Sequence, residues 1–411
     1  MKIVPEIRGV KDPYIQNKQW RTLNANSSSV TAMEADIVIV GTGAGGGTSA
    51  EIFAKAGLNV LMIEEGPLKS SNSFVMDENK AYGDLYQESA GRVTKDGSIS
   101  ILQGRCVGGT TVVNWTSSFR TPPQTLEHWS KEYQVKGCSE QELEPWFEKM
   151  EQRLNISPWQ ATPNDNNEVL RTGCESLNID WKVIPRNVKG CWNLGYCGMG
   201  CPTNAKQSML VTTIPSALNH GAILLYSARA ERLIIEGKKV TGIVCSVLDK
   251  NKKLTTKKIT LKAPYVILAC GGINSPALLL RSNAPDPKKR IGKRTFLHPT
   301  AFSFAQFDQD ISPFYGAPQS IYSDHFQWVN GIEGPLGYKL EVPPLHPGIT
   351  SALLMGHGEK QVDELSKLAN THAMIALMRD GFHGDSEGAN IQLSEDGSPI
   401  IDYPINDYLW A

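Results

Sequence analysis

Residues 36–66 read DIVIVGTGAGGGTSAEIFAKAGLNVLMIEEG, and this stretch predicts a strand, a glycine loop, a helix and a second strand in that order. Residues 37–40 are an apolar, β-branched run of the kind that forms a buried parallel strand. A helix is expected from about Gly45 to Ala56, and a second strand over 60–63 leads into Glu64. This order of elements is typical of a unit that binds a dinucleotide.

Three glycines in the stretch, Gly41, Gly43 and Gly46, fit the pattern G-x-G-x-x-G. The first permits a tight turn, the second lets the backbone approach a pyrophosphate, and the third lets the helix pack close to the strand. The N–H groups at the start of the helix would point at the phosphates, and Glu64, about 20 residues beyond the loop, would accept hydrogen bonds from ribose hydroxyls. The alternative is a tight glycine turn that binds no nucleotide. The stretch by itself does not choose between NAD and FAD.

Length and charge limit the classes of protein that fit. The chain has 411 residues and a net charge of −1, which suits two domains and argues against a surface for nucleic acid. The sequence has no apolar run of about 18 residues, and residues 1–20 lack the apolar core of a secretory signal. Eight cysteines do not suggest a disulfide scaffold. We expect a cytoplasmic protein, with export on a partner's signal and peripheral membrane attachment left open.

The rest of the chain alternates predicted helices, turns and strands. Segment 24–34 is polar and predicts a linker before the first strand. Ser139 and Glu142 have the spacing of a capping box, but Pro145 follows, so the prediction is a fresh helix that starts near Pro145. A further helix is expected over about 211–218. Strands are expected at 222–226, 232–236, 240–248, 257–263 and 265–270, with the third and fourth of these forming a hairpin.

Glycine turns recur far from the first one, at Gly108 and Gly109 and again at Gly271. A simple nicotinamide dehydrogenase would continue after residue 66 with a regular series of strand–helix units, and this chain does not. A chain that returns repeatedly to one long dinucleotide favours a deeply buried FAD. A nicotinamide dehydrogenase stays an alternative, because the first loop is common to both classes.

Several segments resemble those of the glucose–methanol–choline (GMC) oxidoreductases, which are FAD enzymes that act on alcohols. The resemblance runs from about Ala35 to the end of the chain. It is carried by VIVGTGAGGGTSAEIFAKAGLNVLMIEEGP (38–67), GRCVGGTTVVNW (104–115), YSARAERLIIE (226–236), ACGGINSPALLLRS (269–282) and IGKRTFLHP (291–299). The fourth segment departs from the family pattern, because NAPDP replaces the usual glycine-rich ending. Together the segments imply a tightly bound FAD.

The resemblance also implies which residues contact FAD. Glu64 takes the ribose position, Asn114 matches the asparagine that lies beside the flavin, and the backbone near Ala230 touches adenine. Asn114 could instead cap a turn, and the turn at 271–276 could be purely structural. The predicted contacts are Gly41, Gly43, Ala44, Gly46, Glu64, Gly108, Gly109, Thr110, Asn114, Ala230 and Gly271.

The fold class implied by the resemblance is α/β, with an FAD-binding, Rossmann-like domain and a second, substrate domain built on a mainly antiparallel sheet. Residues 1–34 would be an N-terminal extension and linker. The FAD-binding domain would comprise 35–120 and 205–295. The substrate domain would comprise 121–204 and 296–411, truncated at its C-terminal end.

A cysteine-rich loop, CWNLGYCGMGCP, covers residues 191–202. Thiolates from Cys191, Cys197 and Cys201 could hold an iron–sulfur cluster, and the spacing resembles that of the flavin subunits of membrane-linked sugar dehydrogenases. Zinc fits less well, because no histidine follows closely as a fourth ligand. The residues that follow, PTNAKQSMLVT, instead resemble the cluster-free loop of long-chain alcohol oxidases. Both interpretations stay open.

The catalytic histidine of the family lies in a C-terminal segment that this sequence lacks, since it ends at DYPINDYLWA. The resemblance therefore implies that the family's base lies beyond residue 411 and that the chain as given is inactive. His298, in the segment that resembles the family's histidine–proline motif, is the first alternative base, although it could equally be a packing histidine. The remaining histidines of the C-terminal region are not assigned this role: His346, His357, His372 and His383.

The activity implied by the resemblance is oxidation of the CH–OH group of a small-molecule alcohol. A histidine base would take the alcohol proton while a hydride passes to flavin N5. The implied substrate is an apolar or long-chain primary alcohol, with a sterol or a sugar alcohol as alternatives, and the acceptor is oxygen, a quinone or a cytochrome. Two other functions stay open. One is an iron–sulfur FAD dehydrogenase subunit that passes electrons to a membrane acceptor, and the other is a non-catalytic fragment.

Overall fold

The chain divides into two units in the computed structural model, which describes residues 9–354, 356–384 and 386–410. The first unit holds the described residues up to Asn114 together with Gly198–Thr295 and Gly388–Pro404. The second unit holds Trp115–Cys197, Phe296–Glu387 and the described residues from Ile405 onwards. The C-terminal boundary therefore differs from the prediction, because residues 388–404 lie in the first unit and not with the antiparallel sheet.

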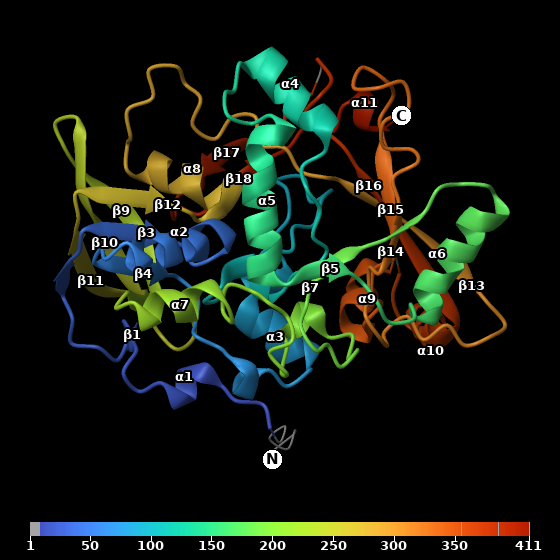
Figure 1. The fold of residues 1–411 in the computed structure, drawn as a ribbon, viewed down its shortest axis with the longest axis horizontal. Coiled ribbons are helices and arrows are strands. Elements are labelled where there is room, and N and C mark those ends of the chain that lie inside the picture. The colour runs from blue at the N-terminus through green and yellow to red at the C-terminus, as the bar shows by residue number, and fades with distance from the viewer. Residues whose placement is uncertain (1–8, 355, 385, 411) are drawn as a thin grey trace. The chain divides into compact units, whose positions relative to one another are not determined.

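A parallel five-stranded sheet of order β1-β8-β4-β3-β12 organises the first unit (Figure 1). Its strands β3 and β4 are buried along their whole length, as their apolar composition predicts. Val40 pairs with Ile63 on one side and with Leu268 on the other, so β3, β4 and β12 end at the same edge. The strands are β1 (Arg21–Asn24), β3 (Ile37–Val40), β4 (Val60–Glu64), β8 (Ile223–Tyr226) and β12 (Tyr265–Leu268).

A second sheet, of order β2-β11-β10-β9, packs against the parallel sheet through a core that includes Val38, Leu61, Ile243 and Leu261. The expected hairpin is confirmed, because β10 and β11 pair in antiparallel fashion. The predicted linker is wrong at its end, because β2 pairs in parallel with β11 and its backbone groups complete the sheet. The strands are β2 (Ala32–Glu34), β9 (Ala228–Glu236), β10 (Lys239–Leu248) and β11 (Leu254–Lys262).

Helices of the first unit follow the strand ends. Helix α2 (Ala44–Lys55) leaves the first glycine loop and lies beside α7 (Thr213–Asn219), as Figure 1 shows. Helix α8 (Gly271–Arg281) begins directly after β12, where the sequence predicts a turn that opens a helix. The remaining elements are α1 (Pro13–Gln16), α3 (Glu78–Leu85), the strands β17 (Asn390–Leu393) and β18 (Pro399–Asp402), and short 3-10 turns at Ser71–Ser73, Gln87–Ala90 and Gly109–Val112.

An antiparallel sheet of order β13-β16-β15-β14-β6 organises the second unit. Helix α6 (Asp165–Ser176) covers one face, where Leu170 and Cys174 pack against Ile321 and Leu340. The strands are β6 (Lys182–Val183), β13 (Thr300–Gln306), β14 (Ile321–Ser323), β15 (Tyr338–Glu341) and β16 (Thr371–Met378), with a separate pair β5 (Ile156–Pro158) and β7 (Pro185–Asn187).

The helix around Pro145 differs from the prediction. Helix α5 runs without a break over Glu140–Leu154, with Pro145 inside it. Ser139 and Glu142 form a complete capping box, which satisfies the first N–H groups and sets the start of the helix. The other helices of this unit are α4 (Pro123–Tyr133), α9 (Pro347–Leu353), α10 (Glu359–Ser366) and α11 (Asp407–Trp410), with 3-10 turns at Cys197–Met199, where the units join in sequence, and Leu368–Asn370.

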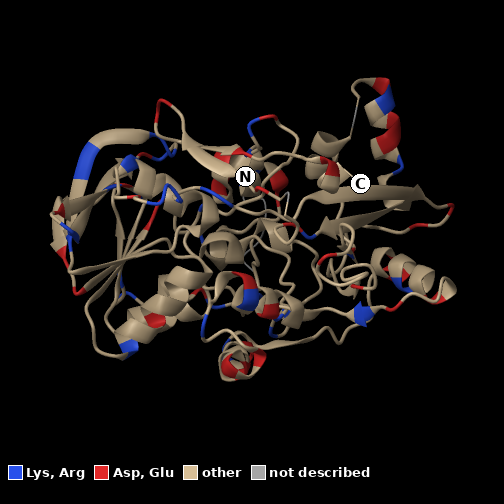
Figure 2. Cartoon of the chain, turned by 90° about the horizontal axis from the view of Figure 1, so that it is seen from above, with Lys and Arg blue, Asp and Glu red and all other residues tan. Residues whose placement is uncertain are grey.

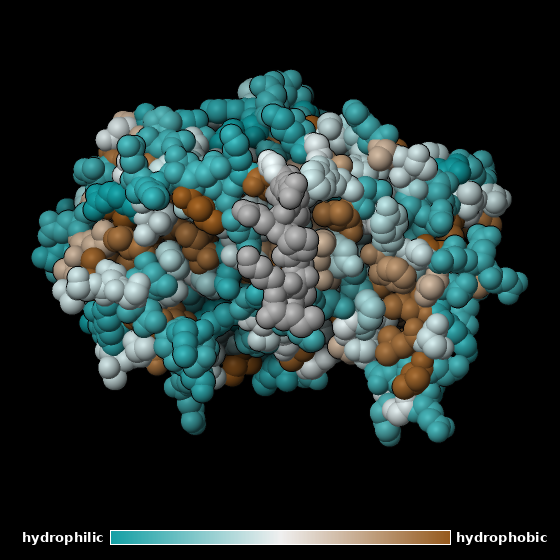
Figure 3. Space-filling view, turned by 90° about the horizontal axis from the view of Figure 1, so that it is seen from below, coloured by the Kyte–Doolittle hydropathy of each residue, from teal (hydrophilic) through white to brown (hydrophobic). Residues whose placement is uncertain are grey.

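The surface mixes charges and apolar groups. Figure 2 shows basic and acidic residues distributed over the described chain, in keeping with the net charge of −1. Figure 3 shows apolar residues exposed among hydrophilic ones on one face. Elsewhere in the chain, the rings of Phe302 and Phe304 on the edge strand β13 stack with centroids 5.8 Å apart and are 42% and 45% exposed. Every helix within the described residues is too short or too polar to span a bilayer.

Candidate functional site

A cavity of about 610 Å³ lies in the first unit, at the edge where β3, β4 and β12 end. Both glycine loops, the first part of β9 and the start of α8 line it. The predicted contacts that line the cavity are Gly41, Gly43, Ala44, Glu64, Gly109, Thr110, Ala230 and Gly271. Gly46, Gly108 and Asn114 lie outside its lining.

Two backbone contacts in the first glycine loop leave no room for a side chain. Gly41 has a φ of +95°, and a Cβ there would lie 2.5 Å from the carbonyl oxygen of Ala269. A Cβ on Gly46 would overlap the carbonyl oxygen of Gly41. Gly43 differs, because a Cβ there would meet only the Cα of Gly109, at 3.9 Å. Gly41 and Gly46 are therefore needed for the loop itself, whereas Gly43 leaves space on the cavity side.

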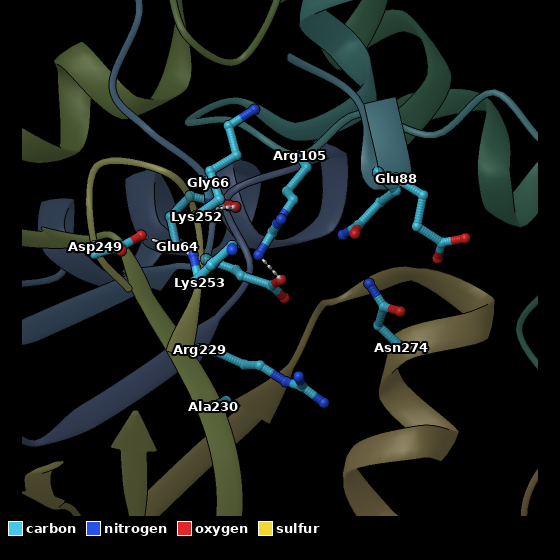
Figure 4. Close-up of polar contacts among 12 residues, drawn as sticks. Glu64, Gly66, Glu88, Arg105, Arg229, Ala230, Asp249, Lys252, Lys253 and Asn274 are labelled. Atoms are coloured by element: carbon cyan, nitrogen blue, oxygen red, sulfur yellow. Dashed lines mark hydrogen bonds and ion pairs between the residues drawn. The ribbon is translucent and has the colours of Figure 1, made fainter. Parts of the chain in front are cut away.

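Glu64 is buried at the end of β4. Its Oε2 accepts hydrogen bonds from the N–H and the hydroxyl of Thr42, at 3.1 and 2.6 Å. Its Oε1 accepts from the N–H of Gly66 at 2.9 Å, and Figure 4 labels this pair of residues. Burial raises the pKa of this carboxyl above its ordinary value, although the three hydrogen bonds oppose the shift. A carboxylate oxygen can accept more than one hydrogen bond, so Glu64 keeps capacity for a hydroxyl group in the cavity.

Thr42 joins the two glycine loops. Its hydroxyl donates to Glu64 and accepts from the N–H of Gly108 at 2.9 Å, which fixes the second loop against the first. A Cβ on Gly109 would come within 2.8 Å of the Cα of Gly43, so the loops touch backbone to backbone. Sequence reasoning missed Thr42 because it occupies an unspecified position of the glycine motif. Gly108 does not line the cavity, but its N–H group donates to Thr42 and so helps to hold the two loops together.

Strand β9 is irregular where it borders the cavity. Ala230 pairs with Cys245 and Arg232 pairs with Val244, so the residue between them has no partner opposite it. Such a bulge re-aims the side chains around it. Arg281 of α8 donates to the carbonyl oxygens of Ala230 and of the bulged Glu231, both at 3.1 Å. The guanidinium thus holds the segment around Ala230 in place.

Arg92 is buried beside the cavity and connects three segments of the first unit. Its Nε donates to Glu88 at 2.8 Å, and its Nη1 donates to Gln103 at 2.6 Å and to Asn274 of α8 at 3.4 Å. All four residues line the cavity. The sequence carried no signal for this network, because Glu88, Arg92 and Gln103 lie outside the segments that carry the resemblance.

A second ion pair lies in the cavity wall, where Arg105 contacts Glu65 at 2.6 Å. Figure 4 shows the Arg105 side chain reaching towards this carboxylate from the segment before the second glycine loop. The pair neutralises both charges. The wall therefore combines paired charges, backbone N–H groups at the start of α2 and the carboxylate of Glu64.

The family model of GMC oxidoreductases matches residues 82–300, which is more than half of the chain. The chain belongs to the GMC oxidoreductase family. The matched segment contains the second glycine loop, β9 and the start of α8, three of the regions that line the cavity. The resemblance stated from the sequence is confirmed, and so is its fold class.

Plant relatives of this GMC chain are similar over most of its length. It is 29% identical to long-chain-alcohol oxidase FAO1 of Arabidopsis thaliana, over 90% of this chain and 50% of that protein. It is 30% identical to long-chain-alcohol oxidase FAO4B of the same plant, over 88% of this chain and 49% of that protein. The chain thus spans about half the length of the curated relatives it matches.

Solved GMC structures share the fold. A formate oxidase of Aspergillus oryzae superimposes with a TM-score of 0.66 and 14% identity, over 92% of this chain and 79% of that one. At this level of identity, the likeness concerns the fold alone.

Asn114, predicted to lie beside the flavin, ends the first unit of this GMC chain. Its carbonyl oxygen accepts a hydrogen bond at 2.6 Å from Lys206, which also donates to Val112 at 2.8 Å. The Oδ1 atom of Asn114 is buried and has no hydrogen-bond partner within the described part of the chain. This orphaned acceptor suits a donor from a bound group, and the role of Asn114 stays a prediction.

The three loop cysteines each contact protein groups. Cys197 accepts a hydrogen bond from Arg186 at 3.6 Å, Cys191 accepts from the N–H of Asn193 at 3.4 Å, and Cys201 lies 3.3 Å from the hydroxyl of Thr203. Residues 9–354, 356–384 and 386–410 contain no group of three His, Cys, Asp or Glu side chains placed to hold a metal ion. The structure gives the predicted iron–sulfur cluster no support, and it stays a prediction.

His298 lies in the second unit, in the loop that leads into β13. Its side chain is exposed, and its carbonyl oxygen accepts a hydrogen bond from the hydroxyl of Thr300 at 3.2 Å. The surrounding protein nevertheless desolvates the ring enough to lower the pKa of His298 below its ordinary value, and the charge of Lys339 adds to this shift, so the packing alternative stays open. Whether His298 acts as a base stays a prediction.

The cavity residues of this GMC chain fit a dinucleotide. The volume of about 610 Å³ falls within the range of ligand pockets. A Cβ on Gly43 would fill space on the cavity side, and Glu64 offers a carboxylate to hydroxyls. The first residues of α2, Ala44 and Gly45, line the cavity, and N–H groups at the start of a helix suit phosphates. Close backbone approach, donors for phosphate and an acceptor for ribose therefore occur together.

Proposed function

We propose that the cavity binds FAD and that the protein is an FAD-dependent oxidoreductase acting on the CH–OH group of alcohols. One observation carries the proposal: two glycine loops far apart in sequence meet at one cavity, joined by Thr42 and bordered by Glu64. A nicotinamide site would need only the first of these loops. The return of the chain at Gly109 and again at Gly271 suits a longer, enclosed cofactor.

Each side of the cavity has a part in holding FAD. The start of α2 binds the diphosphate through backbone N–H groups, and Glu64 accepts from ribose hydroxyls. The second glycine loop, fixed by Thr42, carries Thr110 on the cavity wall and leads to Asn114. When bound, FAD supplies the acceptor for a hydride from the alcohol carbon. The chain's residues orient the cofactor and exclude water from it.

The proposed substrate is a long-chain primary alcohol, and the proposed acceptor is oxygen. Both come from the relatives, whose names are long-chain-alcohol oxidases. We propose that the second unit, with its antiparallel sheet, is the substrate domain. Its face opposite α6 carries Lys339, Tyr322 and the exposed ring of Phe302, so it can contact a substrate with both apolar and polar parts.

The test has two steps. The purified protein is denatured and the released flavin is separated, with FAD expected and FMN absent. Oxidation of primary alcohols of increasing chain length is then followed by hydrogen peroxide release and by reduction of an artificial dye. A yellow protein that oxidises long alcohols and releases peroxide supports the proposal. A colourless protein that binds NADH overturns the cofactor assignment, and a yellow one that oxidises only sugar alcohols overturns the substrate class.

A further inference from the structure

Arg229 is a cavity residue in segment 226–236, where the resemblance assigns a role only to the backbone near Ala230. It lies on β9, one residue before Ala230, and its side chain extends away from the strand (Figure 4). Its Nη2 donates to the carbonyl oxygen of Gly397 at 3.1 Å, and Arg281 donates to the same oxygen at 3.1 Å. Because Arg281 holds this turn independently, the turn does not depend on Arg229 alone.

Arg229 makes no direct ion pair within the described residues, although the carboxylate of Asp396, one residue before Gly397, interacts with it electrostatically. Arg92 pairs with Glu88 and Arg105 pairs with Glu65, whereas no carboxylate of the described residues lies within ion-pair distance of Arg229. A guanidinium that is not held in a direct ion pair keeps N–H donors and its planar face for a ligand. Arg229 is thus available to a bound group in a way that the paired arginines are not.

The position of Arg229 indicates which part of the ligand it meets. The first glycine loop follows β3, Glu64 ends the neighbouring strand β4, and the next strand, β8, leads within two residues into β9 and Arg229. Phosphates at the glycine loop and ribose at Glu64 therefore place the adenine near β9. Arg229 lies at this end of the cavity, away from the start of α2.

We propose that the guanidinium of Arg229 stacks on the adenine ring of the bound dinucleotide and contributes to the selection of FAD over FMN. This inference rests on the proposed function. A guanidinium is planar and weakly hydrated, and it stacks well on aromatic faces. Its attraction to the ring quadrupole strengthens as water is excluded. The contact adds to the Ala230 backbone, which Arg281 holds in place.

The experiment compares three probes, FAD, FMN and ADP, on flavin-stripped protein. Arg229→Ala should weaken FAD and ADP by about 3- to 30-fold, the range of one cation–π contact, and leave FMN unchanged. Binding is measured by flavin fluorescence for FAD and FMN and by calorimetry for ADP. The rise in melting temperature with each ligand gives a second readout that does not need fully stable stripped protein. Equal weakening of FAD and FMN, or none, overturns the inference.

Two further variants separate stacking from simple charge. Arg229→Lys keeps the charge but not the plane, so FAD and ADP should stay weakened, and full recovery overturns stacking. Arg232→Ala is the matched control, since Arg232 lies on the same strand, is exposed and does not line the cavity. It should bind all three probes as the unmodified protein does. If the unmodified protein binds NADH and neither flavin, the proposed function fails; if it binds FAD and Arg229→Ala changes nothing, only this inference fails.

Discussion

In the glycine loops of the first unit, distant segments meet where glycines leave room for backbone. Gly41 lies against Ala269, Gly109 lies against Gly43, and in each case a Cβ would come within 2.8 Å of a backbone atom. Around Arg186 and α6 in the second unit, distant segments meet instead through buried polar side chains. Arg186 is fully buried and donates to Thr116 at 2.6 Å and to the carbonyl oxygen of Pro318 at 2.7 Å.

Asn166 and Asn167 of α6 extend the second pattern. Asn167 accepts from the N–H groups of Ser320 and Ile321, at 2.9 and 3.2 Å, and Asn166 lies 2.7 Å from the ring of His372. The side-chain amide of Asn167 thus accepts from backbone N–H groups that would otherwise need a backbone carbonyl as partner. The comparison predicts opposite sensitivities at these contacts: the glycine loops of the first unit should be more sensitive to added volume, and the contacts of Arg186, Asn166 and Asn167 should be more sensitive to loss of a polar group.

The largest expected effect is loss of the Arg186 guanidinium. Arg186→Met should lower the free energy of unfolding of the second unit by about 3–5 kcal/mol, because buried acceptors on Thr116, Trp115 and Pro318 lose their donor. The measurement is the urea midpoint. Arg120→Met is the matched control, since Arg120 is exposed and its contacts with Glu144 and Glu151 are solvated, so its midpoint should move much less. Similar shifts in both variants would contradict the comparison.

The next effect tests added volume in the first unit. Gly46→Ala should destabilise the cofactor-free protein by about 3 kcal/mol, because its Cβ overlaps the carbonyl oxygen of Gly41 and only backbone movement relieves this. Gly43→Ala meets only ordinary contact and should leave that stability nearly unchanged. It should nevertheless lower FAD occupancy, since its methyl group enters the cavity. The melting temperature of the cofactor-free protein and the flavin content are measured for both variants. Equal destabilisation by the two substitutions would show that Gly43, like Gly46, is needed for backbone packing.

The same contrast explains how far the sequence could be read. Glycines at a regular spacing indicate where two backbone segments approach closely. The positions of the loop at Gly41 and Gly43, of the helix after it and of Glu64 were therefore predicted to within a residue or two. The turn at Gly271 and the β10–β11 hairpin were predicted for the same reason, since turns have local chemistry.

Other parts of the structure could not be predicted, because their determinants are not local. Nothing around Arg186 or Asn167 distinguishes them from surface residues, and the oxygen and N–H partners described above lie 70 to 154 residues away. The sequence likewise carries no local signal that residues 388–404 return to the first unit, or that Arg92 lines the cavity. Pro145 was misjudged because a complete capping box outweighs the loss of one helical hydrogen bond.

A smaller effect concerns pH in the second unit. His372 is buried, and burial lowers its pKa from 6.5 to about 4. The folded state therefore binds fewer protons than the unfolded chain between these values, so stability is fully present above pH 6.5 and is lost as the pH falls towards 4, by at most about 3 kcal/mol. His372→Gln keeps a donor for Asn166 but cannot titrate. Its urea midpoint should fall less than that of the unmodified protein over this range, and parallel curves would exclude His372 as the cause.

The smallest expected effect lies in the first unit, at Glu64. Its pKa is raised above 4.5 by burial, so the cofactor-free protein loses the stability contributed by the neutral form as the pH rises through that raised value. FAD should show the opposite trend, because ribose hydroxyls donate to the carboxylate form and bind better as it ionises. Glu64→Gln should therefore weaken FAD by about tenfold at neutral pH, the difference between a charged and a neutral acceptor, and should flatten the pH dependence of the FAD affinity. The measurement is FAD titration between about pH 5 and 8, with each variant's folding checked at every pH. If Glu64→Gln retained the pH slope of the unmodified protein, another cavity group would control it, and the ribose role of Glu64 would fail while the cavity itself still bound FAD.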